Sequence, residues 1–158
     1  MATLKLRATS FATPQDIAAY NKCRAAGHDD AYCTSHKDGG DNGKGKWGDD
    51  TTSKTVAYCA LGPSLQKKHQ PVHVVLSTRK GTPLGKPFDC IQGDGGDEGV
   101  IDLNPGSLLA AGLPYDMELS ARADVTIGGG GGATGSTKAP KPAGKPSPKK
   151  SAAKKKRN

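Results

Sequence analysis

Apolar and polar side chains alternate along several short segments of the first 127 residues. In the clearest segment, from 117 to 127, apolar residues occupy every second position, as they do along the buried face of a β-strand. The same pattern occurs at 4–10 and 72–76, and shorter strand candidates lie at 55–61 and 86–91. Strands are therefore expected to outnumber helices.

Two helices are predicted from their capping residues. The sequence Thr-Pro-Gln-Asp at 13–16 offers an N-cap, a proline at the first helical position and an acidic residue in the first turn, so a helix should run from 14 to 26. Asn-Pro begins a shorter helix at 104–111, which a glycine ends. These elements predict a mainly β fold, a small mixed or antiparallel barrel with one or two short helices.

A run of five glycines, at 128–132, ends the patterned region. Glycine loses more conformational entropy on ordering than any other residue, so 128–137 is predicted to be a linker. The segment 138–158 contains no large apolar residue, cannot offset its ordering entropy by burial, and is predicted to be a disordered tail. The chain thus divides into a compact domain at 1–127, with its barrel core at about 55–127, a linker and a tail.

The net charge of +8 is concentrated in the tail. Nine cationic side chains and no acidic ones lie between 138 and 157, so the rest of the chain has a formal charge of −1. The composition resembles that of the carboxy-terminal tails of linker histones, and lysines on an extended chain can follow a phosphate backbone. The residues expected to bind nucleic acid or another polyanion are Lys138, Lys141, Lys145, Lys149, Lys150, Lys154, Lys155, Lys156 and Arg157.

The tail has no aromatic side chain that could stack on bases, so we expect no sequence preference. The alternatives for this segment are a solubilising role, a nuclear-localisation signal at 154–157, and binding to anionic wall polymers or lipids.

Two neighbouring stretches carry a family resemblance. The first, Lys-Pro-Phe-Asp-Cys-Ile-Gln-Gly-Asp at 86–94, brings an aspartate into a glycine-containing loop. The second, Gly-Val-Ile-Asp-Leu-Asn-Pro-Gly-Ser-Leu-Leu-Ala-Ala-Gly-Leu at 99–113, contains an Ile-Asp-Leu turn and an alanine-leucine helix. Together they resemble the signature of double-psi β-barrels in the rare lipoprotein A and expansin group. The resemblance covers roughly 55–127 and implies a small six-stranded double-psi-like barrel.

In that family the loop aspartate is a general acid that acts on a β-1,4-linked glycan of peptidoglycan or plant cell wall. The resemblance assigns this role to Asp94, with Asp89 as a second candidate because the loop length leaves the register open. A general acid of this kind needs a raised pKa, which Asp97 and Glu98 would favour as like-charged neighbours. Asp102 is expected to be structural, with its carboxylate capping the turn.

The sequence departs from the family pattern where a partner histidine is usual. Cys59 stands at that position, His69 and His73 lie nearby outside any matching motif, and Gly95 replaces the arginine that often follows the aspartate. Two functions therefore compete. One is a non-enzymatic structural or DNA-associated protein, for example a phage-encoded or virion component, and the other is a peptidoglycan-acting protein like a lytic transglycosylase. The departures and the basic tail narrowly favour the first, and whether the chain is an enzyme stays open.

The four cysteines are expected to be free thiols, because the sequence begins with no recognisable secretory signal. Pairing of Cys23 with Cys33 across the helix end is the alternative. These two and His28 supply three of the four ligands of a zinc knuckle, so we expect no metal site, and no cofactor motif is present. No apolar run is long enough to cross a membrane, and a cytoplasmic or virion location is expected.

Overall fold

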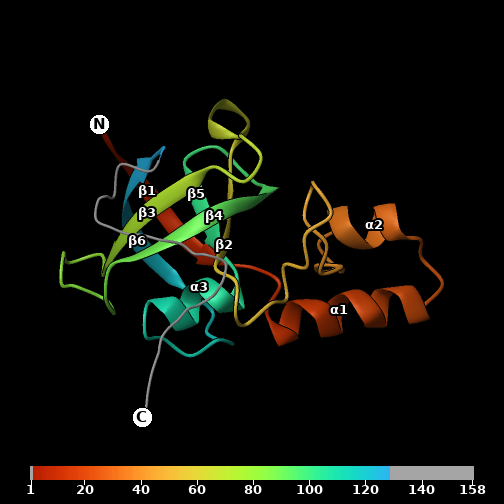
Figure 1. Ribbon diagram of the computed structural model, residues 1–158. Helices are drawn as coiled ribbons and strands as arrows, with labels where there is room; N and C mark the ends of the chain where they lie inside the picture. The colour runs from red at the N-terminus through yellow and green to blue at the C-terminus, as the bar shows by residue number, and fades with distance from the viewer. Residues whose placement is uncertain (1, 129–158) are drawn as a thin grey trace, which may run out of the picture.

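The computed structural model describes residues 2–128, in which six strands close into a single barrel (Figure 1). Around the barrel the strands follow the order β1-β5-β2-β4-β3-β6. They are β1 (Thr3–Ser10), β2 (Tyr58–Leu61), β3 (Pro71–Ser77), β4 (Phe88–Gly95), β5 (Val100–Leu103) and β6 (Ser120–Ile127). The prediction of a mainly β, six-stranded closed barrel is confirmed.

The barrel is mixed rather than antiparallel throughout. β1 runs parallel to β5, and β2 runs parallel to β4, whereas the other neighbouring strands are antiparallel. The longest pairing joins the two ends of the domain, from Thr3 opposite Thr126 to Thr9 opposite Ser120. Because β5 lies between β1 and β2, its side chains face residues from the first and the middle parts of the chain.

Inward-facing aliphatic side chains fill the barrel. Val72, Val74 and Leu76 are buried on β3, and the residues between them are more exposed, as the alternating pattern predicts. Helix α3 (Pro105–Ala110) closes one end of the barrel and buries Leu108 completely. Each such side chain stabilises the fold by about 1.5–3 kcal/mol through burial alone.

Two segments near the family resemblance differ from their predicted structure. The Ile-Asp-Leu segment at 101–103 is not a turn but belongs to strand β5, because its backbone pairs with β1 on one side and β2 on the other. The acidic glycine segment at 93–99 is not wholly a loop either. Strand β4 continues to Gly95, so Asp94 lies near the end of a strand whose register with β2 shifts by one residue beside it.

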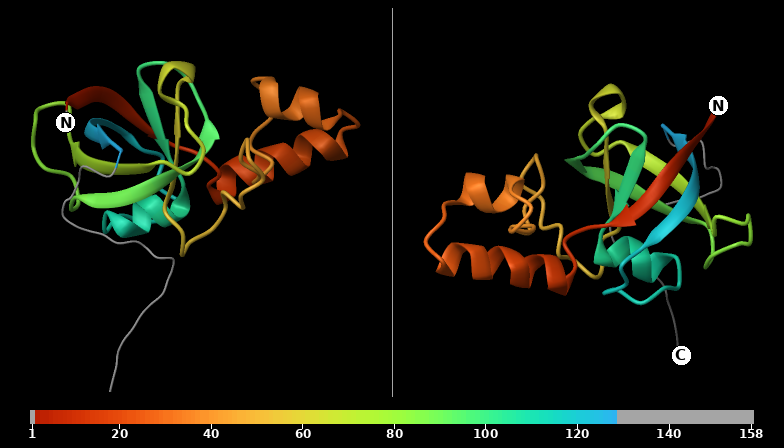
Figure 2. Two further views of the ribbon diagram at one scale, coloured as in Figure 1. Left: turned by 45° about the horizontal axis from the view of Figure 1, so that its top comes forward. Right: turned by 180° about the vertical axis from the view of Figure 1, so that it is seen from behind.

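Helices α1 (Pro14–Ala25) and α2 (Asp30–Ser35) form an arm that extends away from the barrel (Figures 1 and 2). α1 begins at the predicted residue, and the Thr13 N–H donates to Asp16 Oδ2 at 3.4 Å as part of a capping box. Helix α2 was not predicted. Its N-cap, Asp29, accepts a hydrogen bond from the Tyr32 N–H at 2.9 Å.

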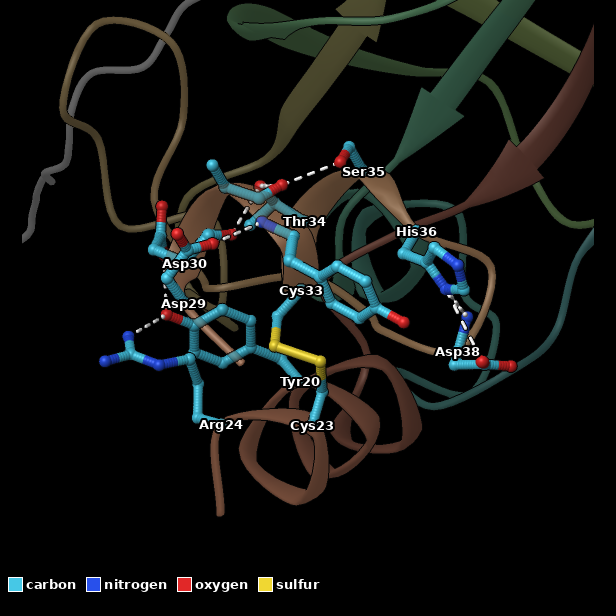
Figure 3. The surroundings of a disulfide bond; sticks show 12 residues. Tyr20, Cys23, Arg24, Asp29, Asp30, Cys33, Thr34, Ser35, His36 and Asp38 are labelled. Atoms are coloured by element: carbon cyan, nitrogen blue, oxygen red, sulfur yellow. Dashed lines mark hydrogen bonds and ion pairs between the residues drawn. A yellow bond between two sulfur atoms is a disulfide. The ribbon is translucent and has the colours of Figure 1, made fainter. Parts of the chain in front are cut away.

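A disulfide between Cys23 and Cys33 joins the two helices of the arm (Figure 3). The expectation of free thiols is therefore wrong for this pair and the alternative pairing is correct, whereas Cys59 and Cys90 are free and buried in the barrel. The Cα atoms of the pair lie 5.7 Å apart, within the range that a disulfide spans. The two cysteines are also the buried residues of their helices, so the sulfur–sulfur bond takes the place of an apolar core in the arm.

Most of the predicted linker (128–137) and all of the predicted tail (138–158) lie outside the described residues. The same holds for the nine residues expected to bind polyanions, namely Lys138, Lys141, Lys145, Lys149, Lys150, Lys154, Lys155, Lys156 and Arg157. Within residues 2–128, no helix has the length and apolar character needed to span a membrane.

Candidate functional site

A cavity of about 360 Å³ lies where the arm meets the barrel. From the barrel side, the ends of β4 and β5 contribute Asp94 and Asp102, and β2 contributes Ala60. From the arm side, α2 and the segment that follows it contribute Thr34 and Asp41. The other lining residues are Phe11, Gly40, Asn42, Lys44, Gly45, Lys46 and Gly95. Both parts of the molecule are needed to form this cavity.

Asp41 reaches the cavity because the segment after α2 folds back closely along the arm. The Gly40 N–H donates to the Cys33 carbonyl at 2.9 Å, and the Asp41 N–H donates to the Asp16 carbonyl at 3.2 Å. A Cβ atom at Gly40 would lie 2.1 Å from the Asp16 carbonyl oxygen, so this approach of two backbones requires glycine. The disulfide-bonded arm thus fixes the position of Asp41.

Asp94, the general acid expected from the resemblance, lines the cavity. Its Oδ1 accepts hydrogen bonds from the Lys46 N–H and the Gly95 N–H, each at 2.8 Å. Burial raises the pKa of Asp94 above its ordinary value, although the two N–H groups and the charge of Lys46 oppose the shift. In residues 2–128, Oδ2 accepts no hydrogen bond, so this oxygen can carry a proton toward the cavity.

Asp97 and Glu98, which were expected to raise the pKa of Asp94, are not the main causes of its shift. Glu98 accepts hydrogen bonds from the hydroxyl and the N–H of Ser64, at 2.6 and 2.7 Å, and these lower the pKa of Glu98. The charge of Asp97 helps to raise the pKa of Asp102 and is not a main cause of the raised pKa of Asp94. Burial, and not the charge of these neighbours, is the main cause of the raised pKa of Asp94.

Two further carboxyl groups of the cavity have raised pKa values. Burial and then the charges of Asp94, Asp16 and Asp102 raise the pKa of Asp41 to about 6, against the opposing hydrogen bond from the Gly43 N–H. Burial also raises the pKa of Asp102, whose Oδ1 accepts a hydrogen bond from the Thr9 hydroxyl on β1. Asp102 was expected to cap a turn, but it belongs to strand β5 and lines the cavity.

Replacing Asp41 by asparagine should raise the free energy of unfolding at pH 7. The pKa of Asp41 rises from 3.8 to about 6 on folding, so its contribution to stability is fully present below pH 3.8 and is lost as the pH rises through 6. Asparagine stays neutral and avoids this loss, which we expect to be about 1–2 kcal/mol after allowing for the partial exposure of the carboxyl. Urea unfolding should show the gain at pH 7 and no gain near pH 3.5. A gain that is equal at both pH values would contradict the assigned pKa.

The other residues singled out in the sequence lie away from the cavity. Asp89 is on the outer face of β4, 43% exposed, and pairs with His73 of β3 at 2.7 Å. Cys59, which stands where the family usually has histidine, is fully buried in the barrel core. Burial raises the pKa of its neighbour Cys90, which keeps that thiol protonated and unreactive. His69 does not line the cavity but pairs with Asp49, in the loop that carries Lys46, at 2.7 Å.

Asp94, which lines the cavity, was singled out from the sequence, but Asp41 was not. The sequence Asp-Asn-Gly at 41–43 is typical of a turn, which it forms, since the Asp41 carboxylate accepts a hydrogen bond from the Gly43 N–H at 2.7 Å. The cavity location of Asp41 depends on the return of this segment along the arm, and that return has no signal in the local sequence. Over the part of the chain that the structure covers, no group of three His, Cys, Asp or Glu side chains is arranged to hold a metal ion.

Comparison with protein-family models, with curated proteins and with solved structures finds no match to this chain. The function is therefore inferred from the barrel and from the chemistry of the cavity.

Proposed function

We propose that the barrel acts on a β-1,4-linked glycan of the peptidoglycan type and that Asp94 is its general acid. The observation that carries this proposal is the asymmetry of the Asp94 carboxyl. One of its oxygens is fixed by two backbone N–H groups, the other is free of hydrogen bonds from residues 2–128, and burial raises the pKa of the group. A carboxyl that is held in place and keeps its proton is what the cleavage of a glycosidic bond requires.

The reaction needs one proton donor. Asp94 gives its proton to the glycosidic oxygen, and the bond between that oxygen and the sugar carbon C1 breaks. The 6-hydroxyl of the same sugar then forms a bond to C1, and its proton returns to Asp94. The products are a shortened glycan and a 1,6-anhydro sugar, as in lytic transglycosylases, and no water is consumed.

The architecture of the barrel supports the same proposal. Its two parallel strand pairs, β1 with β5 and β2 with β4, are compatible with the double-psi class that the sequence resembles. The Asp94 of the resemblance also lies at the end of a barrel strand, beside a cavity. Small-molecule sites are often found in the mouths of β-barrels.

Incubation of the purified protein with peptidoglycan between pH 5 and pH 8 tests the proposal. We expect release of anhydro-muropeptides, detected by mass spectrometry. If no anhydro-muropeptide is released at any pH, the barrel is not an enzyme of this type.

A second candidate function, non-enzymatic binding of DNA or another polyanion, is favoured by the distribution of charge. Nine cations lie between 138 and 157, whereas the rest of the chain has a formal charge of −1. A neutral barrel with a cationic extension suits a structural or virion-associated protein, and this role does not require the cavity. The polyanion would be held by its phosphates or carboxylates and not by base sequence.

Truncation after Ile127 should abolish salt-sensitive retention on DNA. If the full chain neutralises about six to nine phosphates, the logarithm of its binding constant should fall against the logarithm of salt concentration with a slope of roughly −5 to −8. The truncated chain, with a formal charge of −1, should show almost no retention. Filter binding at several salt concentrations measures both chains, and equal retention by the two would show that the extension does not bind DNA.

A further inference from the structure

Next to the cavity, a tight loop presents Trp47, the only tryptophan of the chain. The loop is closed by a bridge between Lys44 and Asp50. Within it, the Gly45 N–H donates to the Asp49 carbonyl, and the Gly48 N–H donates to the Gly45 carbonyl, both at 2.9 Å. Trp47 lies at the tip of this loop and is only half-buried.

The loop is fixed to the wall of the cavity. The N–H of Lys46, the residue before Trp47, donates to Asp94 at 2.8 Å, and Lys46 itself lines the cavity. A Cβ atom at Gly45 would lie 1.9 Å from the Gly93 carbonyl oxygen, so the loop packs against β4 backbone to backbone. Trp47 therefore lies in a loop that borders the cavity, next to the residue whose N–H binds Asp94.

Two polar side chains lie close to the indole. The His69 ring meets the Trp47 ring edge-on, with 6.4 Å between the ring centroids. The Lys46 ammonium lies over the indole ring, 5.8 Å from its centroid, and donates to Gln66 Oε1 at 2.6 Å. The Gln66 side chain lies against Gly95, which lines the cavity.

The orientation of His69 is determined by its partners. Its Nε2 lies 2.7 Å from Asp49 Oδ2, and the Tyr58 hydroxyl donates to the other oxygen of Asp49 at 3.4 Å. His69 also has a left-handed backbone with a φ of 56°, a conformation that costs about 1–3 kcal/mol in a residue other than glycine. The conformation is held by the His69 N–H, which donates to the Gln92 carbonyl at 3.0 Å. Asp49 thus occupies one ring nitrogen, and within residues 2–128 Nδ1 has no hydrogen-bond partner.

We propose that Trp47 and His69 form a sugar-binding subsite that extends the cavity. This inference rests on the proposed action on a β-1,4-linked glycan and assigns the place of a second sugar ring. A pyranose presents a face of C–H groups that packs on the indole, whose negatively polarised face favours it. Its equatorial hydroxyls, at the rim of the ring, would bond to His69 Nδ1 and to the side chains of Lys46 and Gln66.

A nucleic-acid base could also stack on an exposed indole. The charges of the loop at 44–50 do not favour that occupant, because Asp49 and Asp50 balance Lys44 and Lys46, and Asp94, bound to the Lys46 N–H, adds a further carboxyl. A phosphate backbone would gain no net attraction here, whereas an uncharged glycan needs none. The subsite is therefore assigned to a neutral β-1,4-linked oligosaccharide.

Because the chain contains one tryptophan, its fluorescence reports on this subsite directly. The full-length Asp94→Asn variant, in which turnover should be slow, is titrated with chitohexaose, with cellohexaose, and with the α-linked maltohexaose as a control. We expect a saturable change in Trp47 emission with a β-linked hexaose and none with maltohexaose. The two β-linked arms distinguish a glycan that carries N-acetyl groups from one that does not.

Two histidine variants in the same background provide the matched comparison. His69→Ala should weaken binding of the hexaose about tenfold, which corresponds to the loss of one hydrogen bond. His73→Ala, on the outer face of the barrel, should leave binding unchanged. Calorimetric titration of Trp47→Ala, compared with Trp47→Phe, adds a measurement that does not depend on fluorescence, and binding should be lost in the first and partly kept in the second.

The outcomes separate this inference from the proposed reaction. A saturable response without any release of anhydro-muropeptides by the unmodified protein would uphold the subsite and reject the general-acid role. Release of anhydro-muropeptides with no response of Trp47, and with unchanged activity of Trp47→Ala, would overturn the subsite alone. A response to single-stranded DNA and not to either β-linked hexaose would also overturn it, as would equal weakening in His69→Ala and His73→Ala.

Discussion

Asp94→Asn should lower the rate of anhydro-muropeptide release by about 10²–10⁴-fold, the usual contribution of a general acid. Asparagine has the same shape as aspartate, and its amide oxygen can still accept the hydrogen bonds that the Lys46 and Gly95 N–H groups make with Oδ1. The fold and the loop that carries Lys46 should therefore be preserved. What the variant lacks is the proton, so its loss of rate reports on proton transfer and not on stability.

The control is Asp89→Asn, because Asp89 was the second candidate from the sequence and lies on the outer face of β4 with His73. This variant should keep the full rate. In the unmodified protein the rate should fall as the pH rises through the raised pKa of Asp94, since only the protonated group is a donor. A full rate in Asp94→Asn, or an equal loss in both variants, would contradict the assignment of the general acid.

Asn104→Ala should lower the free energy of unfolding by about 3–5 kcal/mol, because it leaves several buried backbone groups without partners. The Asn104 side chain is completely buried. Its Oδ1 accepts hydrogen bonds from the N–H groups of Ser107, in the first turn of α3, and Tyr58, at the start of β2, at 2.8 and 2.9 Å. The same side chain therefore caps a helix and positions a strand.

The amide nitrogen of Asn104 makes a second group of contacts. It donates to the carbonyl oxygens of Thr51, Ser53 and Val56 at 3.0, 3.1 and 3.1 Å, which holds the segment before β2 against the barrel. Alanine removes all of these partners at once, and each group left unsatisfied costs about 1–3 kcal/mol before relaxation and entry of water. Chemical denaturation measures the loss, and the exposed Asn21→Ala on α1 is the control. A loss below 1 kcal/mol would contradict this account of Asn104.

Local patterns predicted those parts of the fold that local sequence determines. The alternation at 117–127 and the N-cap at 13–16 correspond to β6 and to the start of α1. Strand β5 was interpreted as a turn because it is four residues long and its pairing partners, β1 and β2, are distant in the sequence. Periodicity over so few residues carries little information, and only the closure of the barrel makes this segment a strand.

The site was predictable to the same limited extent. Asp94 could be found because the residues around it carry a family resemblance, whereas Asp41 enters the cavity through contacts made by the arm with Asp16 and Cys33. Burial of Asp102 likewise depends on β5 lying beside β1, where Thr9 donates to it. The raised pKa values of Asp41, Asp94 and Asp102 arise from this tertiary burial, so they could not be predicted from the local sequence.

The arm and the barrel enclose carboxyl groups whose pKa values are raised by burial. A pH titration of the aspartate side-chain carboxyl carbons by carbon-13 NMR tests this directly. We predict a midpoint of about 6 for Asp41 and midpoints raised above the ordinary value for Asp94 and Asp102. If all three titrated at the ordinary aspartate value of about 3.9, the cavity would be open to water and the proposed proton donor would not exist.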